Sequence, residues 1–389
     1  DWSSDVCSSD LPHRSRWIAI LGVLALGVIG VGSIPGTTIA QSGTGLVRLS
    51  DAAAVNYTAL PLSVGGNSVP VVMLAMSVDE QLYRVAYNDY TDVNGDGIID
   101  PTYSDGIEYR GYFDPRLCYS YSDDHYRAAA PVTPNTHRCA GDWSGNFLNW
   151  VSMSRIDVIR AGLYGGMRVK GRDENDGAIL ERAYLPPESA AWVKVYRGPD
   201  PIGDYTPFDD VTAGMPVSFC NVSLAAGSQD VANSGNDTAS RPLIRIARGN
   251  FPLWSSTEAL QCLWDGEADR PRRDDEGSEE FVARVDVCAA DSPTLRESFC
   301  RGYPAANPTI WRPAGKLQQY GETGQVRFGL ISGSYARPRS GGQLRRNPGR
   351  LAGNGVNPAA CVTGDEIQLS DGAFCNRGDG TEGIINTVD

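Results

Sequence analysis

Mainly apolar runs occur at two places far apart in the chain. Residues 69–76 read VPVVMLAM between polar neighbours, and residues 326–331 read VRFGLI. A strand that is covered on both faces carries apolar residues at successive positions, so each run predicts a buried strand. Residues 281–287 instead alternate between apolar and polar side chains, which predicts one half-buried strand.

Helical spacing replaces these patterns between residues 144 and 165. The apolar positions there are Leu148, Val151, Ile156, Ile159 and Leu163. Ser144 or Asn146 can cap a helix at its start, and Gly165 followed by Gly166 can end it. We therefore expect a single helix whose aliphatic stripe packs against a core.

The stretches between these elements predict an elaborated α/β fold. Residues 89–144 are rich in Asp, Tyr and Gly without a helical period, so we interpret them as an insertion. Residues 195–280 mix Pro, Gly, Asp and short apolar runs, and their charged end, 265–280, is expected to be a solvated loop. A strand, an insertion, a helix and a second strand, in that order, favour an α/β layered core.

Composition divides the chain into five segments. Residues 1–11 resemble a translated sequencing adapter and are left out of the fold prediction. Residues 12–40 hold arginines, an uncharged apolar run and then small residues, in the order of a secretory signal peptide. Residues 41–68 form a lead-in, and 69–335 form the α/β region. Residues 336–389 form a loop-rich, disulfide-containing segment, and we expect the chain to be a fragment, truncated at both ends.

The apolar run of the signal segment is short. It falls below the roughly 20 residues that a spanning helix needs, so we expect no permanent membrane anchor after cleavage. The mature chain is expected to be exported.

Oxygen-bearing side chains alternate along residues 92–100, which read DVNGDGIID. A loop of the EF-hand type binds Ca²⁺ through alternate positions from the first to the ninth. Those positions here are Asp92, Asn94, Asp96, the backbone carbonyl of Ile98 and Asp100. Gly97 occupies the sixth position, where the loop turns sharply. The pattern predicts a Ca²⁺ site.

This loop departs from a paired EF-hand after its ninth position. Tyr103 stands where a bidentate glutamate is expected, and Asp89 or Asp105 could complete the ligand shell. Ile99 is expected to point into a core and anchor the loop. The arrangement predicts a dockerin-style or single calcium loop, and the alternative is a solvated Asp/Asn/Gly turn.

Cysteine usage supports export. One of the nine cysteines, Cys7, lies in the adapter-like segment. The others are Cys118, Cys139, Cys220, Cys262, Cys288, Cys300, Cys361 and Cys375. An even set in an exported protein predicts four disulfides, and nearest-neighbour pairing is the simplest of many possibilities. No CxxC motif occurs, which argues against a structural zinc site.

Charge and motifs exclude several classes of function. The net charge of −13 argues against nucleic acid as a partner, because binding a phosphate backbone requires a basic surface. No HExxH, GxSxG, Walker or dinucleotide motif occurs, so we do not expect an enzyme. Arg377, Gly378 and Asp379 form a tripeptide found in integrin ligands, and so short a match is a weak candidate adhesion motif.

Four long blocks of the chain carry a resemblance to a known family. They are residues 86–121 (AYNDYTDVNGDGIIDPTYSDGIEYRGYFDPRLCYSY), 143–166 (WSGNFLNWVSMSRIDVIRAGLYGG), 180–196 (LERAYLPPESAAWVKVY) and 315–335 (GKLQQYGETGQVRFGLISGSY). Together they resemble the PilC/PilY family of type IV pilus biogenesis and tip-associated adhesin proteins. The resemblance implies a protein at the pilus tip or cell surface, outer membrane-associated or secreted, that supports pilus assembly and adhesion. The implied partners are minor and major pilins and a host or abiotic surface.

The same resemblance implies a von Willebrand factor A-like three-layer core with a large calcium-binding, disulfide-containing insertion. Residues 71–76 would be its first strand, 155–163 its first helix and 326–331 a later strand. The DxSxS adhesion motif should follow the first strand, but residues 76–80 read MSVDE, so an integrin-like Mg²⁺ site is not expected. The alternative function is a secreted, calcium-stabilised enzyme that acts on extracellular polysaccharide.

Overall fold

The computed structural model describes residues 69–77, 79–169, 178–186, 191–225, 240–256, 261–267, 270–289, 292–304, 308–333, 342–354, 361–362, 364–375 and 383–388. Contacts divide the chain into two units, residues 1–65 and 66–389, and all described residues lie in the second unit. The adapter-like segment, the signal peptide and the lead-in lie outside the described residues, as does the tripeptide at 377–379.

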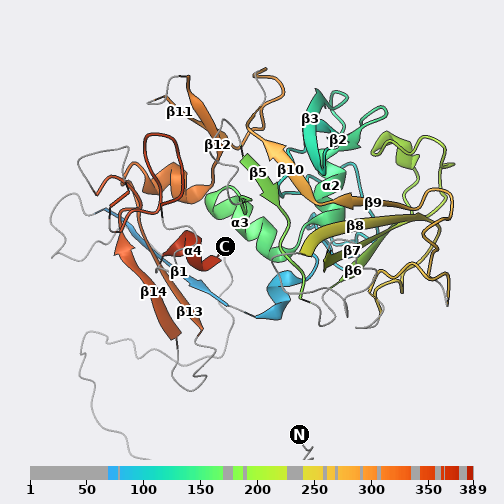
Figure 1. The fold of residues 1–389 in the computed structure, drawn as a ribbon, viewed down its shortest axis with the longest axis horizontal. Coiled ribbons are helices and arrows are strands. Elements are labelled where there is room, and N and C mark those ends of the chain that lie inside the picture. The colour runs from blue at the N-terminus through green and yellow to red at the C-terminus, as the bar shows by residue number, and fades with distance from the viewer. Residues whose placement is uncertain are drawn as a thin grey trace, which may run out of the picture. The chain divides into compact units, whose positions relative to one another are not determined.

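The described part is a mixed α/β structure with many strands and few helices (Figure 1). Its first half contains β1 (Val71–Met76), η1 (Glu80–Tyr83), β2 (Leu117–Ser122), β3 (His125–Pro131), β4 (Trp143–Ser144), α2 (Gly145–Ser152), α3 (Arg155–Tyr164), β5 (Ala178–Glu181), β6 (Trp192–Tyr196), η2 (Ile202–Asp204) and β7 (Val217–Ala225). Its second half contains β8 (Ser240–Arg248), β9 (Glu279–Val282), β10 (Arg284–Val287), β11 (Cys300–Tyr303), β12 (Ile310–Pro313), η5 (Leu317–Gly321), β13 (Arg327–Gly333), β14 (Gly342–Gly349) and α4 (Ile384–Val388). The α/β class predicted from the sequence is confirmed at this level.

The strands of the described residues form four sheets. One has the order β4-β2-β3-β10-β5, and a second is the antiparallel meander β6-β7-β8-β9. The third has the order β1-β13-β14, and β11 pairs with β12 as a two-stranded ribbon. Residues 195–280, for which the sequence predicted only short apolar runs, therefore supply β7, β8 and part of β9 to a regular sheet.

The two apolar runs of the sequence meet in the three-stranded sheet. β1 pairs with β13 in parallel, with Leu74 opposite Leu330, although the chain makes a long excursion between them. Phe328 and Leu330 are buried on one face of this sheet, in a cluster that also contains Ile156 of α3 and Ile384 of α4. The pairing of distant segments is what a parallel connection requires.

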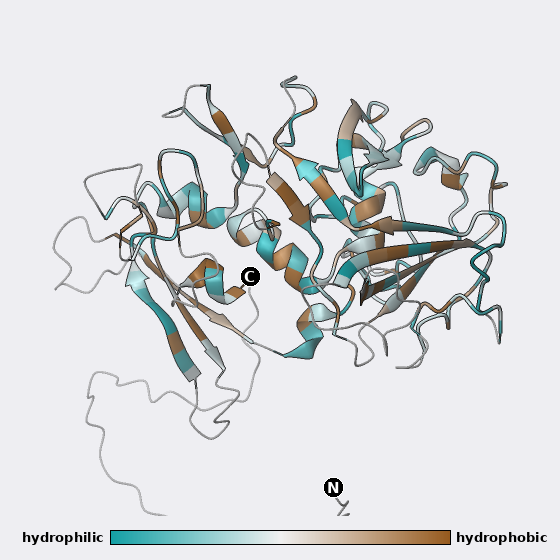
Figure 2. Cartoon of the chain, in the orientation of Figure 1, coloured by the Kyte–Doolittle hydropathy of each residue, from teal (hydrophilic) through white to brown (hydrophobic). Residues whose placement is uncertain are grey.

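The other face of this sheet is open among the described residues. Val71 is 57% exposed and Met73 is 41% exposed, so the prediction that β1 is a buried central strand is wrong for the part of the chain that the structure describes. Ile331 of β13 and Leu344 of β14 are also exposed. The helices α3 and α4 give this sheet one covering layer, whereas a three-layer core was expected. Figure 2 shows β14 as mainly hydrophilic, which agrees with its sequence GQLRRNPG.

The single helix expected between residues 144 and 165 is two helices. Ser144 caps α2, and Gly165 ends α3 with a φ of 92°, so both outer boundaries are confirmed. Between them, Ser154 begins a new helix through a capping box with Asp157, whose carboxylate accepts hydrogen bonds from the Ser154 backbone N–H and hydroxyl. The helical spacing continues across the break, which is why the pattern alone did not reveal it.

The strand predicted for residues 281–287 is divided between two sheets. β9 ends at Val282 and pairs with β8, whereas β10 begins at Arg284 and pairs with β3 and β5. Two further corrections concern the C-terminal segment, which was expected to consist of loops. β14 lies within it, and residues 384–388 form the short helix α4.

Candidate functional site

Two asparagines of α2 hold the segment that follows the acidic loop. The side-chain N–H₂ of Asn146 donates to the Ile107 carbonyl at 2.8 Å and to the Tyr103 hydroxyl at 3.0 Å, and its oxygen accepts from the Tyr109 N–H at 2.7 Å. Asn149 is fully buried, donates to the carbonyls of Tyr109 and Phe113, and accepts from the Phe113 N–H. These side chains replace the backbone partners that an irregular buried segment lacks.

Aromatic rings fill the space around these asparagines. Tyr103 packs edge-on against Phe147 and Tyr205, with ring centroids 5.1 Å and 4.7 Å apart. Tyr109 and Tyr112 are almost completely buried, and burial raises the pKa of both phenols. The cluster of tyrosines in the sequence is therefore mainly a packed core, although Tyr90 is 72% exposed.

The acidic loop 92–100 is closed by hydrogen bonds between its side chains and its own backbone. The Asp92 carboxylate accepts from the N–H groups of Gly95, Asp96 and Gly97 at 2.6, 3.1 and 2.7 Å. The hydrogen bond from Gly97 is the main cause that lowers the pKa of Asp92. Gly97 has a φ of +91°, the left-handed conformation that glycine adopts without strain.

The other predicted ligands complete the closure. Asn94 Oδ1 accepts from the Asp96 N–H, and Asp96 Oδ1 accepts from the Ile98 N–H, both at 2.8 Å. Asp100 Oδ2 accepts from the Val93 N–H at 2.8 Å across the base of the loop. The side-chain donor set consists only of oxygen atoms, which is the chemistry that Ca²⁺ prefers.

The loop is attached to the core by a different residue from the one predicted. Ile99 is 56% exposed, so the expectation that it points into a core is wrong. Val93 instead is partly buried and packs against the aromatic core. Ile98, whose backbone carbonyl is a predicted ligand, has a side chain that is 69% exposed. The apolar residues of the loop therefore lie mostly on its outside.

The two additional candidate ligands have other partners. Asp89 forms an ion pair with Lys194 of β6, and Asp105 Oδ1 accepts a hydrogen bond from the His137 N–H at 2.9 Å. Asp105 Oδ2 also lies 3.9 Å from Arg138 Nε. Both carboxylates therefore help to fix the segment around the loop to the core.

The four disulfides of the described residues join nearest neighbours in the sequence, which is the simplest of the pairings that the sequence left open. The pairs are Cys118–Cys139, Cys220–Cys262, Cys288–Cys300 and Cys361–Cys375. The first two pairs are buried in the core, whereas Cys361 is exposed.

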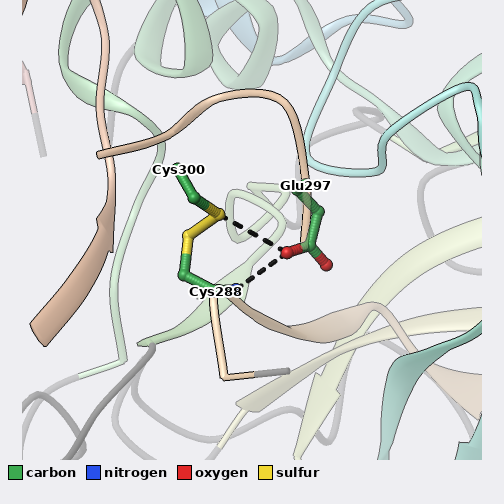
Figure 3. A group of neighbouring side chains, drawn as sticks. All are labelled: Cys288, Glu297 and Cys300. Atoms are coloured by element: carbon green, nitrogen blue, oxygen red, sulfur yellow. Dashed lines mark hydrogen bonds between the residues drawn. A yellow bond between two sulfur atoms is a disulfide. The ribbon is translucent and has the colours of Figure 1, made fainter. Parts of the chain in front are cut away.

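Within the residues that the structure describes, one group of three His, Cys, Asp or Glu side chains brings its ligand atoms within 4.8 Å of one another. It consists of Cys288, Glu297 and Cys300 (Figure 3). Its sulfur atoms are joined as a disulfide, so they are not thiolates and do not act as metal ligands in this state. The aspartates of the acidic loop do not form such a group.

Sequence reasoning missed the residues that depend on distant contacts. Lys194, Asn149 and Glu297 are almost completely buried polar residues, and none stands in a recognisable motif. Glu297 lies three residues before Cys300, and this short spacing was the one feature of the sequence that could have indicated a carboxylate beside the disulfide. In the part of the chain that the structure describes, no helix has the length and apolar character needed to cross a membrane.

Comparison with known proteins gives matches to one family. A family model described as the small alpha/beta domain of PilY1 homologues matches residues 100–247, and a model for their second domain matches residues 328–389. A type IV pilus biogenesis factor PilY1 homologue of Xylella fastidiosa is 31% identical over 331 residues, which is 81% of this chain and 21% of the relative. A second PilY1 homologue of the same organism is 28% identical over 295 residues, covering 72% of this chain.

These matches define the class of protein as one built from domains of the PilY1-homologue type. The chain belongs to the PilY1 family, which confirms the resemblance found in the sequence. It spans about a fifth of the length of the curated relatives it matches. No solved structure gives a significant match.

Proposed function

We propose that this chain is part of an exported factor that supports type IV pilus biogenesis and surface attachment without enzymatic activity. The observation that carries the proposal is the alignment with a pilus biogenesis factor over 81% of the chain. The relatives are named for pilus biogenesis and not for a catalysed reaction. Partners of this function would be minor and major pilins and a host or abiotic surface.

The covalent structure supports export to the pilus or cell surface. Four disulfides persist in an oxidising compartment and would be reduced in the cytosol. Two of them, Cys118–Cys139 and Cys220–Cys262, are buried in the folded chain. The location at the pilus tip is part of the proposal.

The test is an in-frame deletion of the gene in the source organism, complemented with the intact gene. We expect the deletion to lower pilus number, twitching motility and surface attachment, and complementation to restore all three. The control is the deletion strain that expresses an unrelated exported disulfide-bonded protein in place of the intact gene. Normal piliation, motility and attachment in the deletion strain would contradict the proposal.

We also propose that the loop 92–100 binds one Ca²⁺ ion as a structural or regulatory site. Asp92, Asn94, Asp96, the Ile98 carbonyl and Asp100 would hold the ion. Calcium would neutralise carboxylates that otherwise repel one another, and so couple the order of the loop to ion concentration. The all-oxygen donor set and the left-handed Gly97 support this proposal.

Calcium titration of the full chain by calorimetry tests the proposal. We expect a dissociation constant of roughly 10⁻⁴ to 10⁻³ M, as in other extracellular sites, and loss of binding in the double variant Asp92→Asn/Asp96→Asn. The matched control is Asp123→Asn/Asp124→Asn, which makes the same charge change in the exposed turn between β2 and β3. Equal calcium affinity in the loop variant and the wild type would overturn the site.

We propose in addition that β1, α3 and β13 form the first part of a von Willebrand factor A-like core. The parallel pairing of β1 with β13, and the packing of Ile156 against Leu330, support this proposal. An experimental structure of a longer chain in which further parallel strands join this sheet is the expected result. A sheet that stays at three strands would contradict it.

A further inference from the structure

A buried carboxylate touches the disulfide between β10 and β11. Glu297 is 3% exposed, and its Oε2 accepts a hydrogen bond from the Cys288 N–H at 2.8 Å. The same oxygen lies 3.5 Å from Cys300 Sγ. Figure 3 shows the carboxylate pointing at the Cys288–Cys300 bond from the chain segment that leads into β11.

The contact between oxygen and sulfur brings a titratable group to the disulfide. A disulfide sulfur carries no hydrogen, so only Glu297 can supply a proton at the 3.5 Å contact. Burial raises the pKa of Glu297 to about 7, so the carboxyl group is protonated in part at neutral pH. The Glu297 carboxylate also lies within 4.8 Å of Cys288 Sγ, so a proton donor is in place beside both sulfur atoms.

Other acidic groups surround Glu297 and favour its protonated form. Asp114 and Asp286 both raise the pKa of Glu297 through charge repulsion. The hydrogen bond from the Cys288 N–H lowers the pKa of Glu297 and so opposes them. Tyr119 also forms a hydrogen bond with Glu297, which raises the pKa of the tyrosine. Asp114 is itself fully buried and is held as an anion by Arg116 and by the Ser298 N–H, the latter at 2.6 Å from Asp114 Oδ2. The fixed negative charge belongs to Asp114, which leaves Glu297 as the group that exchanges protons.

The two cysteines differ in their exposure to solvent. Cys288 is 1% exposed, whereas Cys300 is partly exposed at the start of β11. We therefore take Cys300 as the cysteine that an external thiolate attacks. Attack on Cys300 would leave the charge on the buried Cys288 sulfur, where an unpaired anion is costly.

We propose that the Cys288–Cys300 disulfide is a site of thiol–disulfide exchange with an external dithiol, and that Glu297 supplies the proton to the leaving sulfur of Cys288. One thiolate of the dithiol forms a bond to Cys300 Sγ, the disulfide breaks, and the electron pair goes to Cys288 Sγ, which takes the proton from Glu297. The second thiol of the dithiol then displaces Cys300, which is protonated by water. The protein disulfide is reduced to two thiols, and the dithiol is oxidised to a disulfide.

The chain contains its own control for this site. Cys361–Cys375 is also accessible, because Cys361 is exposed, but the group beside it is the amide of Gln368, whose Oε1 lies 3.7 Å from Cys361 Sγ. An amide cannot donate a proton from that oxygen. Both disulfides react with the same reagent in the same solution. The thiolate fraction of the reagent changes with pH equally for both, so it cancels in the ratio of their reduction rates.

The experiment is reduction of the native full chain by dithiothreitol, followed by maleimide labelling and peptide mass spectrometry at each cysteine. A group with a pKa of about 7 is protonated about tenfold more at about pH 5.5 than at about pH 8. We divide the reduction rate of Cys288–Cys300 by that of Cys361–Cys375. This ratio is expected to rise about tenfold when the pH is lowered from about 8 to about 5.5. A ratio that does not change with pH would overturn the proposal.

Two variants separate the proton donor from the fold. Glu297→Gln keeps an oxygen for the Cys288 N–H but has no acidic proton, so the ratio is expected to become independent of pH. Gln368→Ala is the matched control at the other disulfide and is expected to leave the rate at Cys288–Cys300 unchanged. If Glu297→Gln does not fold, the wild-type ratio still decides the question. Resistance of Cys288–Cys300 to reduction at every pH, while Cys361–Cys375 is reduced, would also refute the proposal.

Discussion

Lys194 and Asp89 form an ion pair in which the ammonium group is almost completely buried. The Lys194 side chain is 1% exposed, and its Nζ lies 4.3 Å from the centroid of the Trp150 ring and donates to the Tyr87 carbonyl at 2.5 Å. Burial lowers the pKa of Lys194 to about 8 and raises the pKa of Asp89. The pair joins the segment before the acidic loop to β6, so the position of the loop depends on a contact between distant parts of the chain.

Asp89→Asn is expected to destabilise the protein more than a similar change at the surface. The substitution leaves Lys194 buried without a counterion, which costs roughly 3 kcal/mol in the free energy of unfolding. Asp124→Asn is the matched control, because Asp124 pairs with Arg241 where both side chains are exposed, and such pairs contribute about 1 kcal/mol or less. Urea denaturation measures both values, and equal losses would contradict a structural role for the buried pair.

The stability of the protein is expected to depend on pH through Glu297. The folded protein raises the pKa of Glu297 from 4.5 to about 7, so it binds the proton more tightly than the unfolded chain. The stabilisation is therefore complete below about pH 4.5 and is lost as the pH rises through about 7, by up to roughly 3 kcal/mol.

Glu297→Gln isolates this contribution from those of other carboxylates. The difference in unfolding free energy between wild type and variant should shrink as the pH rises over that interval. Urea titrations at a series of pH values measure the difference. A constant difference would mean that Glu297 does not change its protonation state there.

Asn149→Leu is expected to lower stability by about 3 kcal/mol or more, since it leaves three buried backbone groups without a partner. These groups are the Phe113 N–H and the carbonyls of Tyr109 and Phe113. Asn347→Leu on the exposed β14 is the control and should change stability by about 0.5 kcal/mol or less. Thermal unfolding followed by near-ultraviolet circular dichroism reports the loss of the aromatic core directly. Equal effects of the two substitutions would show that Asn149 is dispensable.

The disulfides are expected to contribute more to stability the longer the loops they close, with a logarithmic dependence on loop length. Cys220 and Cys262 are separated by 42 residues and Cys361 and Cys375 by 14. Replacing each pair with alanine should cost about 4 and about 3 kcal/mol respectively, from the entropy of the unfolded chain. The buried pair also loses core packing, so its replacement should be the more damaging of the two. Guanidinium denaturation of the two variants checks the order, and the reverse order would contradict the loop argument.

Removal of calcium is expected to produce a modest loss of stability. With a dissociation constant of roughly 10⁻⁴ to 10⁻³ M, about 2 mM Ca²⁺ stabilises the folded state by roughly 0.6 to 2 kcal/mol. Adding a chelator should lower the unfolding temperature of the wild type but not that of Asp92→Asn/Asp96→Asn. An identical response of both proteins to the chelator would place the calcium effect elsewhere in the molecule.

Several features of the fold were predicted correctly from local sequence. The runs at 69–76 and 326–331 became β1 and β13, and the even set of cysteines formed four disulfides. The hydrogen bonds of the loop 92–100 join residues at most seven positions apart, so the pattern of Asp, Asn and Gly was sufficient to predict a closed turn. Its calcium affinity stays a prediction.

Other features could not be predicted because they depend on contacts between distant segments. The break between α2 and α3 coincides with an isolated antiparallel bridge between Val85 and Ser154, which the helical spacing does not reveal. The change of sheet at Ala283 depends on where β8 and β3 lie in space. The exposure of Ile99 and the burial of Val93 depend on which side of the loop faces the aromatic core.

By itself, the sequence determined the family, the local turns, the number of disulfides and the two strands of the parallel ladder. Only the tertiary structure decided that Lys194 meets Asp89, that Asn149 satisfies the backbone of residues 109–113, and that Glu297 lies against a disulfide. The physical reason is the range of the interactions. Turn hydrogen bonds and apolar periodicity act over a few residues, whereas the burial of a charge or an amide is set by whichever segments surround it after folding.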